Sequence, residues 1–126
     1  MIKKVIIDGD QFTDMDGFYS YIYSLMALYP DWYPGHNLDA LNDMLYSGFG
    51  TEEVRLIRKN AQKSMNELGI IATKEFYQKK IDHGAPYNID WAKEKIRELQ
   101  RGEGETLFEI ILSIFRDHKN IILIIE

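Results

Sequence analysis

Three short apolar runs, one near each end of the chain and one in its middle, constrain the fold most strongly. Residues 3–7 have the β-branched composition of a buried strand, and residues 54–57 alternate as a strand does. Residues 121–125 form a continuous apolar run, which is expected of a strand covered on both faces in a parallel sheet. Helical segments separate the three runs, so the sequence predicts an α/β layer with right-handed crossovers.

Helical periodicity and capping residues place the helices. Thr13 or Asp14 can cap a helix that ends before Pro30. The apolar positions of this helix are Phe18, Ile22, Leu25, Met26 and Leu28. Three more helices are expected over residues 61–68, 70–81 and 89–101. The last of these is strongly charged, and we predict a solvated outer helix. A final helix begins near Thr106 and is apolar on most sides, so we expect it to be buried against the sheet.

The most informative segment is a helix predicted to start at Asn37 and to end near Gly48. Asn37 is a good N-cap residue, because its side-chain oxygen can accept from a free N–H of the first turn. On a helical wheel one face is apolar and carries Leu38, Leu41, Met44 and Leu45. The other face carries Asp39, Asn42, Asp43 and Tyr46. Because Asp39 and Asp43 are four residues apart, their carboxylates are neighbours. Such a pair is either a solvated helix face or, beside the aromatic residues at 32 and 33, a site for a cationic partner.

Charge and composition narrow the class of partner. The chain has 126 residues, enough for one domain, a net charge of −5 and a pI of about 5.2. An acidic protein is a poor direct ligand for nucleic acid, and a basic protein partner is favoured electrostatically. The chain has no cysteine, so nothing indicates disulfides or a thiolate metal site. The first apolar run is too short for a signal peptide. We therefore expect a cytoplasmic protein without cofactor or metal.

Residues 33–45, YPGHNLDALNDML, resemble the signature of the barstar family, intracellular inhibitors of barnase-type ribonucleases. That signature runs tyrosine, any residue, glycine, any residue, asparagine, leucine, aspartate, alanine, leucine, any residue, aspartate. Two flanking features agree: the opening strand runs into Asp8-Gly9 and a helix, and residues 112–117 end in Phe-Arg-Asp before the terminal strand. The resemblance covers about residues 1–49 and 104–126. It implies a small three-stranded parallel sheet packed by helices, and a non-catalytic inhibitor that blocks a nuclease active site.

Carried over by position, the resemblance also implies a binding surface. Asp39 would enter the cationic pocket in which the nuclease holds a substrate phosphate, because a carboxylate can imitate phosphate oxygens toward Arg, Lys or protonated His. The residues around it would be Tyr33, Gly35, Asn37, Asn42 and Asp43. Gly48 would let the chain approach the partner closely, and Asp117 would add an anion from the last helix. The implied partner is a basic, extracellular-type ribonuclease, and we expect the free chain to be a monomer.

The chain departs from the family pattern in several places. Asn42 stands where the best-known member has a large aromatic residue, Pro34 replaces a second tyrosine, and Asp117 is one methylene shorter than glutamate. Residues 50–103 are much longer than a compact family member allows. We therefore expect a single barstar-like domain over residues 1–126, with a helical insertion at about 70–103 that serves packing, a wider interface or an unrelated purpose.

Other interpretations stay open. Asn42 and the insertion favour, as an alternative, a barstar-fold interaction module for a non-nuclease protein. Asp8-Gly9-Asp10 after an apolar strand also invites a phosphatase hypothesis, in which the first aspartate attacks beside a magnesium ion. Phe12 stands where that motif has threonine or valine, so a turn is the simpler account. Residues 14–17 resemble a fragment of a calcium loop, but helix capping is expected there. The histidines, His36, His83 and His118, lack metal-ligand spacing.

Overall fold

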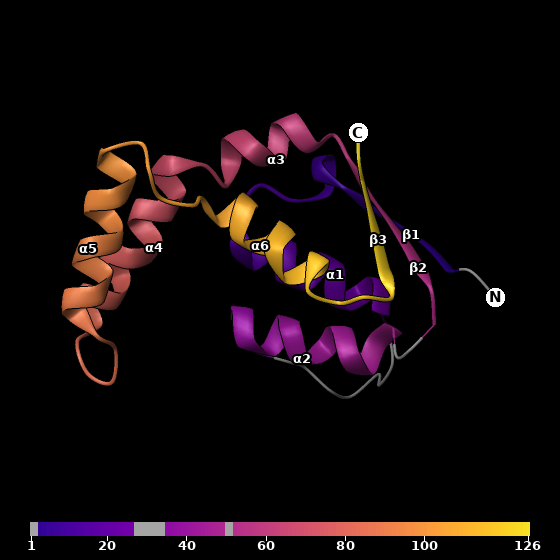
Figure 1. Cartoon of the computed structure of the whole chain (residues 1–126), viewed down its shortest axis with the longest axis horizontal. Coiled ribbons are helices and arrows are strands. Elements are labelled where there is room, and N and C mark those ends of the chain that lie inside the picture. Colours follow the sequence, from indigo (N-terminus) through magenta and orange to yellow (C-terminus); the bar gives the residue numbers. More distant parts are fainter. Residues whose placement is uncertain (1–2, 27–34, 50–51) are drawn as a thin grey trace.

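The computed structural model describes residues 3–26, 35–49 and 52–126, and it confirms the predicted α/β class (Figure 1). Three parallel strands form one sheet in the order β1-β2-β3: β1 (Lys3–Asp8), β2 (Val54–Lys59) and β3 (Ile121–Ile125). Val5 pairs with Leu56, and Leu56 pairs with Leu123, so β2 is the central strand and the three runs are joined side by side.

Each helix that the sequence predicts is present, with limits that differ by a few residues. The helical elements are η1 (Gly9–Gln11), α1 (Met15–Met26), α2 (Leu38–Phe49), α3 (Ala61–Glu67), α4 (Ile70–His83), α5 (Ile89–Gln100) and α6 (Leu107–Arg116). Asp14 caps the start of α1, where its carboxylate accepts from the Gly17 N–H at 2.8 Å. Thr106 and Glu109 form a reciprocal capping box at the start of α6. Within the described residues, no helix is long and apolar enough to cross a membrane.

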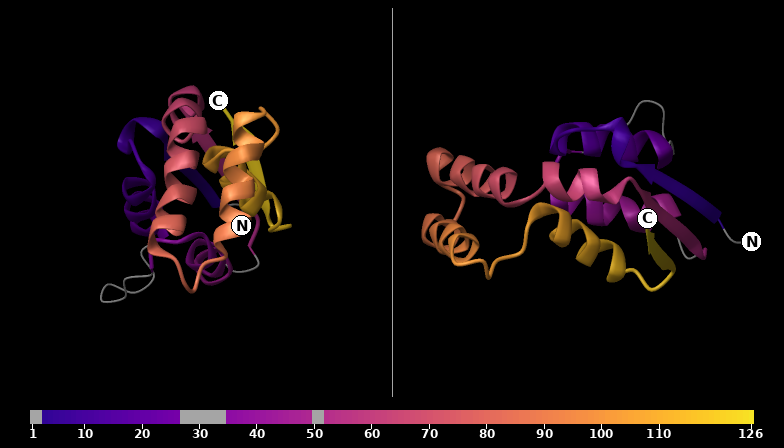
Figure 2. Two further views of the ribbon diagram at one scale, coloured as in Figure 1. Left: turned by 90° about the vertical axis from the view of Figure 1, so that its left-hand side faces the viewer. Right: turned by 90° about the horizontal axis from the view of Figure 1, so that it is seen from above.

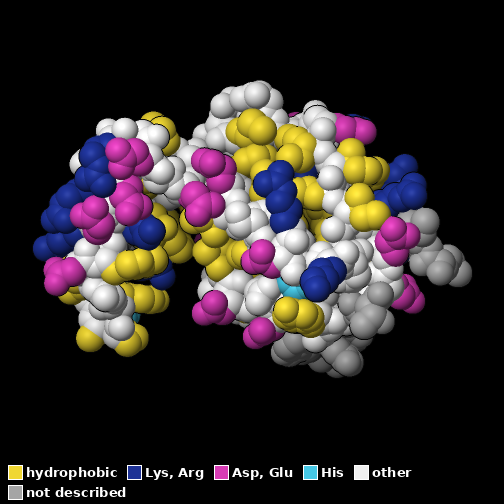
Figure 3. All heavy atoms as spheres, viewed as in Figure 1, with side chains coloured by type: hydrophobic (Ala, Val, Ile, Leu, Met, Phe, Trp, Pro, Cys, Tyr) yellow, Lys and Arg dark blue, Asp and Glu magenta, His cyan; other side chains and the backbone are white. Residues whose placement is uncertain are grey.

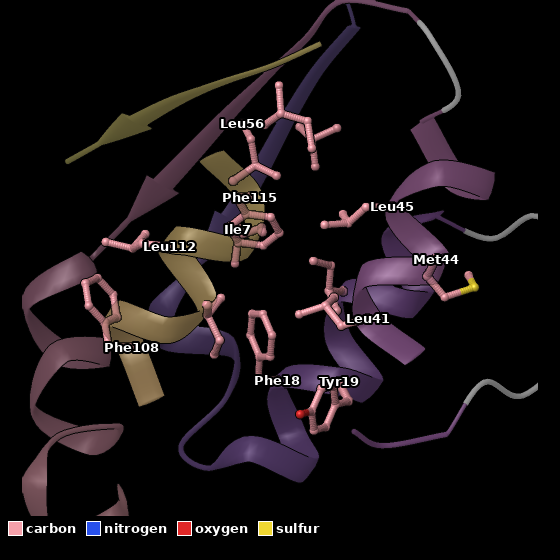
Figure 4. Close-up of a cluster of buried hydrophobic side chains, with 14 of the residues drawn as sticks. Ile7, Phe18, Tyr19, Leu41, Met44, Leu45, Leu56, Phe108, Leu112 and Phe115 are labelled. Carbon is pink, nitrogen blue, oxygen red and sulfur yellow. The ribbon is translucent and has the colours of Figure 1, made fainter. Parts of the chain in front are cut away.

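One hydrophobic core lies between the sheet and helices α1, α2 and α6. Figure 4 shows side chains from β1, β2, α1, α2 and α6 gathered between the sheet and the helices. Ile7 and Leu56 from the sheet meet Phe18 of α1, Leu41 of α2 and Phe115 of α6, and each of the five is 0% exposed. Burial of one such side chain stabilises the fold by roughly 1.5–3 kcal/mol. This core fixes the position of α2, and therefore of the acidic face that α2 turns outward.

The prediction that residues 121–125 form a strand covered on both faces is wrong. β3 is an edge strand, and alternate residues of the sheet face solvent: Ile6 is 44% exposed, Ile122 is 42% exposed and Ile124 is 37% exposed. The helices that form the core lie on one side of the sheet (Figure 1). A continuous apolar run therefore indicates a strand here, but it does not indicate how many of its faces are buried.

The apolar face of α1 also differs from the prediction. Leu25 is 37% exposed, whereas Tyr19 is 3% exposed and packs with Phe18 and Ile22 in the core. Helix α1 is turned so that tyrosine rings supply part of its buried side, and the hydroxyls of the half-buried Tyr21 and Tyr23 donate to the carbonyl oxygens of Ile6 and Gly35. Leu28 and Pro30 lie outside the described residues.

Helices α4 and α5 lie side by side and project from the other elements, away from the sheet (Figures 1 and 2). We call residues 70–103 the hairpin and the other described residues the body. The hairpin has a small core of its own, made of Tyr77, Ala92 and Leu99. Its base is joined to the body, since the Leu107 N–H donates to Thr73 Oγ1 at 2.8 Å. The charged helix α5 packs on α4 and exposes its other side, as the sequence predicts.

Candidate partner-binding site

Helix α2 has the two opposed faces that its sequence predicts. Asn37 caps it, because its side-chain oxygen accepts from the Ala40 N–H at 2.7 Å. Leu41 and Leu45 are 0% exposed, while Asp39 and Asp43 are exposed on the other side. A capped start and a buried apolar face together hold the backbone of α2 firmly. The two carboxylates therefore project from a rigid support.

No described residue neutralises the carboxylates of Asp39 and Asp43. Neither side chain forms an ion pair or a hydrogen bond with any residue in the described ranges. Asp39 lies in the first turn of α2, where the helix dipole favours a negative charge. Asp43 lies one turn further along, beyond most of that compensation. The pair presents two negative charges to solvent, and Asp43 contributes the less compensated one.

A contact that the sequence analysis missed ties α2 to the end of α6. The ring N–H of His118 at Nε2 donates to Asn42 Oδ1 over 2.7 Å, across 76 residues of sequence. His118 is 4% exposed, and its ring lies 4.4 Å from that of Tyr46. Burial lowers the pKa of His118, although the charge of Asp117 opposes the shift. Asn42, predicted to face the partner, therefore uses its carbonyl oxygen to anchor α2.

Two further residues belong with this surface. Tyr46 is 63% exposed one turn after Asn42, so it is an aromatic side chain available to a partner. The helical wheel places Tyr46 on the polar face, but the family signature ends at Asp43 and does not include it. Asp117 is exposed and directly precedes His118. The contact between His118 and Asn42 thus brings the segment that carries Asp117 to the flank of α2.

The segment before α2 is held by aromatic side chains of α1. Tyr23 donates its hydroxyl hydrogen to the Gly35 carbonyl oxygen at 2.9 Å. His36 lies 3.3 Å from a carboxylate oxygen of Asp16, and its ring packs on Tyr19 with centroids 5.4 Å apart. A Cβ on Gly35 would lie 2.8 Å from the Asn37 side-chain nitrogen, so a larger residue here would disturb the cap.

The remaining predicted positions have different outcomes. Gly48 is half-buried in the last turn of α2. Tyr33 lies outside the described residues, as do Trp32 and Pro34. The residues predicted for this surface that the structure does describe are Gly35, Asn37, Asp39, Asn42, Asp43, Gly48 and Asp117, and all except Asp117 belong to α2 or the segment just before it.

The aspartates that suggested a phosphatase have structural partners. The Asp8 carboxylate accepts from the Asp10 N–H at 3.0 Å and from the Asn60 side chain at 2.7 Å. These hydrogen bonds lower the pKa of Asp8. The interpretation of residues 8–10 as a turn at the end of β1 is therefore the one that the structure favours. In the described ranges, no group of three or more His, Cys, Asp or Glu side chains is placed to hold a metal ion.

Comparison with known proteins agrees with this geometry. The family model described as Barstar (barnase inhibitor) matches residues 2–76, more than half of the chain. The chain belongs to the barstar family. No curated protein and no solved structure matches it. The match contains all of α2 and ends within α4, so α5, α6 and β3 of this barstar-family chain lie beyond it.

Proposed function

We propose that this barstar-family chain is a non-catalytic inhibitor of a basic, barnase-like ribonuclease. The observation that carries the proposal is the pair of exposed carboxylates on α2, which have no cationic partner in the described part of the chain. Membership of the family supports the same conclusion. The chain would act as an antitoxin or immunity protein in the cytoplasm of the cell that makes the nuclease.

The mechanism is occupation of the phosphate-binding pocket of the nuclease. A carboxylate offers two acceptor oxygens to the Arg, Lys or protonated His side chains that bind phosphate. Asp39 would enter this pocket, and Asp43, one turn away, would share the same cationic surface. Tyr46 and Gly35 would border the contact, with Tyr33, Asn37 and Gly48 near it and Asp117 adding a further anion. The net charge of −5 would speed the encounter with a basic partner.

Substitution of the two acids tests this mechanism. We expect Asp39→Ala and Asp43→Ala each to weaken inhibition of a barnase-type ribonuclease by about 100-fold or more, because removal of one partner leaves a buried charge unpaired, at about 3–5 kcal/mol. Asp90→Ala is a matched control. Asp90 is also exposed and also follows an asparagine N-cap by two residues, but it lies on α5.

The readouts are the inhibition constant of the purified variants and rescue of growth when each is co-expressed with the nuclease. Unchanged inhibition by both α2 variants, with the fold intact by circular dichroism, would contradict the mechanism. The mechanism would also be contradicted if Asp90→Ala weakened inhibition as much as the α2 variants do, because the loss of inhibition would then reflect net charge alone.

The hairpin favours a second candidate, an interaction module for a protein that is not a nuclease. Residues 70–103 carry seven Lys or Arg and six Asp or Glu side chains, a net charge of +1, whereas the other residues carry −6. The hairpin also exposes Tyr87 at 43% and Trp91 at 47%. Recovery of a non-nuclease partner from the host, with binding lost on Trp91→Ala and kept on Asp39→Ala, would favour this candidate.

A further inference from the structure

A side-chain-sized pocket lies where the hairpin meets the body. Its volume is about 140 Å³, and about 10–15 Å³ suffices for one water. Tyr77 and Ile110 supply its apolar wall, and Lys95, Glu98, Glu103 and Glu105 supply its charged rim. Ile110 belongs to α6 of the body, whereas Tyr77 and Lys95 belong to the hairpin. The pocket therefore exists only because the hairpin is placed against α6.

The polar end of Tyr77 is unpaired in this pocket. Tyr77 is 4% exposed, and its hydroxyl forms no hydrogen bond with any residue that the structure describes. Burial raises the pKa of Tyr77, and the charges of Glu105 and Glu98, which line the same pocket, raise it further. The ring is buried, whereas the hydroxyl oxygen is open to the pocket, where it can accept a hydrogen bond from a ligand N–H.

The rim is acidic even after its internal contacts are considered. Lys95 lies 3.4 Å from Glu98, and Arg101 lies 3.2 Å from Glu103, so each of these acids has a loose cationic neighbour. Among the residues that the structure describes, the Glu105 carboxylate has a hydrogen bond from the Ser113 hydroxyl alone, at 3.5 Å. The lining itself has three carboxylates and one ammonium group, a net charge of −2, and it remains negative at −1 when the Arg101 guanidinium beside Glu103 is included.

We propose that this pocket binds an arginine or lysine side chain of a protein partner. The stem of such a side chain fits against Tyr77 and Ile110, and its cationic end meets the phenol oxygen and the carboxylate of Glu105. The partner is the basic ribonuclease, which makes the pocket a second anchor beside the acids of α2. The identification of the partner as a ribonuclease rests on the proposed function, whereas the affinity of the pocket for a cationic side chain rests on its lining residues alone.

The position of the pocket allows one partner to reach both anchors. The amino-terminal ends of α2 and α6 lie at the same end of the body, the end that faces the hairpin (Figure 1). Figure 3 shows an open notch between the hairpin and the body, with acidic side chains on the flank of the body that borders it. A partner docked on α2 would need only to extend a basic side chain into this notch.

Titration of the full chain with N-acetyl-arginine amide tests the pocket without any nuclease. The readout is the NMR shift of the Ile110 methyl groups and of the Gly104 and Glu105 amides. We expect saturable shifts with a dissociation constant on the order of millimolar, as suits one side chain. The uncharged analogue N-acetyl-citrulline amide has nearly the same shape, and we expect it to bind at least 10-fold more weakly.

Two variants separate the pocket from a general effect of charge. Tyr77→Phe keeps the ring and removes only the hydroxyl, and we expect binding of the arginine amide to weaken about 3-fold or more. Glu105→Gln is expected to weaken it about 10-fold. Glu75→Gln is the matched control, because Glu75 is exposed on α4 outside the pocket lining. Absence of saturable shifts, equal binding of citrulline amide, or equal loss in all three variants would overturn the proposal.

Inhibition assays with the barnase-type ribonuclease then test the identity of the partner. We expect Glu105→Gln to weaken inhibition about 10-fold, and Glu75→Gln to leave it unchanged. If the α2 variants lose inhibition but Glu105→Gln does not, the pocket is not an anchor for the nuclease, and the proposed function stands. If the α2 variants keep inhibition, the proposed function fails, and the arginine titration alone decides the pocket.

Discussion

At the scale of single residues, His118 links the acidic helix to the end of the chain. Its buried ring donates to Asn42 on α2, and no feature of the sequence pairs these two positions, which are 76 residues apart. The pattern of residues 37–48 predicts which side chains of α2 face outward. It cannot predict a polar contact between elements that only the finished fold brings together. For the same reason the packing of Tyr46 on this ring was recognisable only in the structure.

The depressed pKa of His118 predicts a pH dependence of stability. The His118 ring takes up a proton more readily in the unfolded chain than in the folded chain. The neutral ring therefore contributes its full share to the free energy of unfolding above the ordinary pKa of 6.5. That share is lost as the pH falls from 6.5 through the lower pKa of the folded chain. We expect the unfolding free energy, measured with urea between pH 5 and 8, to fall toward pH 5. His118→Gln should flatten this fall, and His83→Gln, at an exposed position, should not. A fall of the same size in His118→Gln would refute the assignment.

Arg58 is a second residue whose surroundings the sequence does not reveal. It is 1% exposed on β2, its two terminal nitrogens have no hydrogen-bond partner in the described structure, and its guanidinium lies near the rings of Phe18 and Phe108. Burial lowers its pKa to about 10. Removing a guanidinium from water is costly, and here two rings at 5.7 Å and 5.1 Å offset only part of the cost.

We therefore expect Arg58→Met to stabilise the fold by about 1–3 kcal/mol, because an unbranched apolar side chain can fill the same space. The measurement is the urea concentration at the midpoint of unfolding, compared between variants whose unfolding free energy has the same dependence on urea concentration. Arg55→Met on the exposed face of the same strand is the control and should change the unfolding free energy by no more than about 0.5 kcal/mol. A loss of stability in Arg58→Met would show that Arg58 has a partner, such as buried water, that compensates its charge.

At the scale of elements, capping and periodicity predicted most of the fold. Apolar runs located the three strands, and cap residues such as Asp14, Asn37 and Thr106 located the starts of helices, because these signals are local. The exposure of β3 was not predictable, since it depends on which side of the sheet the helices occupy. The same limit applies to the candidate site: the sequence predicted the exposed acids of α2, but not the pocket between α6 and the hairpin.

The cap of α2 should matter to both stability and binding. We expect Asn37→Ala to lower the unfolding free energy by about 1 kcal/mol, because an N–H of the first turn loses its acceptor. Fraying of that turn would also loosen Asp39, so inhibition should weaken as well. Asn37→Ser, which keeps an acceptor oxygen, should restore most of both quantities. Inhibition unchanged in Asn37→Ala would mean that the geometry of the first turn does not matter to the partner.

At the scale of the whole molecule, the hairpin and the body differ in how much core each has. The hairpin buries three side chains in its own cluster, whereas the body buries twenty in one. Helix α4 is tied to the body near its base, where Thr73 accepts from Leu107 and where Ala72 and Phe76 pack against the core of the body. Regions with few buried apolar contacts open locally at a lower free energy than the global unfolding. The hairpin should therefore open while the body stays folded.

Native-state hydrogen exchange with two matched leucine truncations tests this difference. Leu99 is 4% exposed in the hairpin and Leu56 is 0% exposed in the central strand, and truncation of either leucine should cost roughly 2–5 kcal/mol locally. We expect Leu99→Ala to speed exchange of the α5 amides and to leave the slowest amides of β2 unchanged. Leu56→Ala should speed exchange of the slowest β2 amides, and it should change the α5 amides less, because these exchange through opening of the hairpin alone. If Leu99→Ala speeds the β2 amides as much as those of α5, the hairpin and the body unfold as one unit, and the pocket between them is as rigid as the core itself.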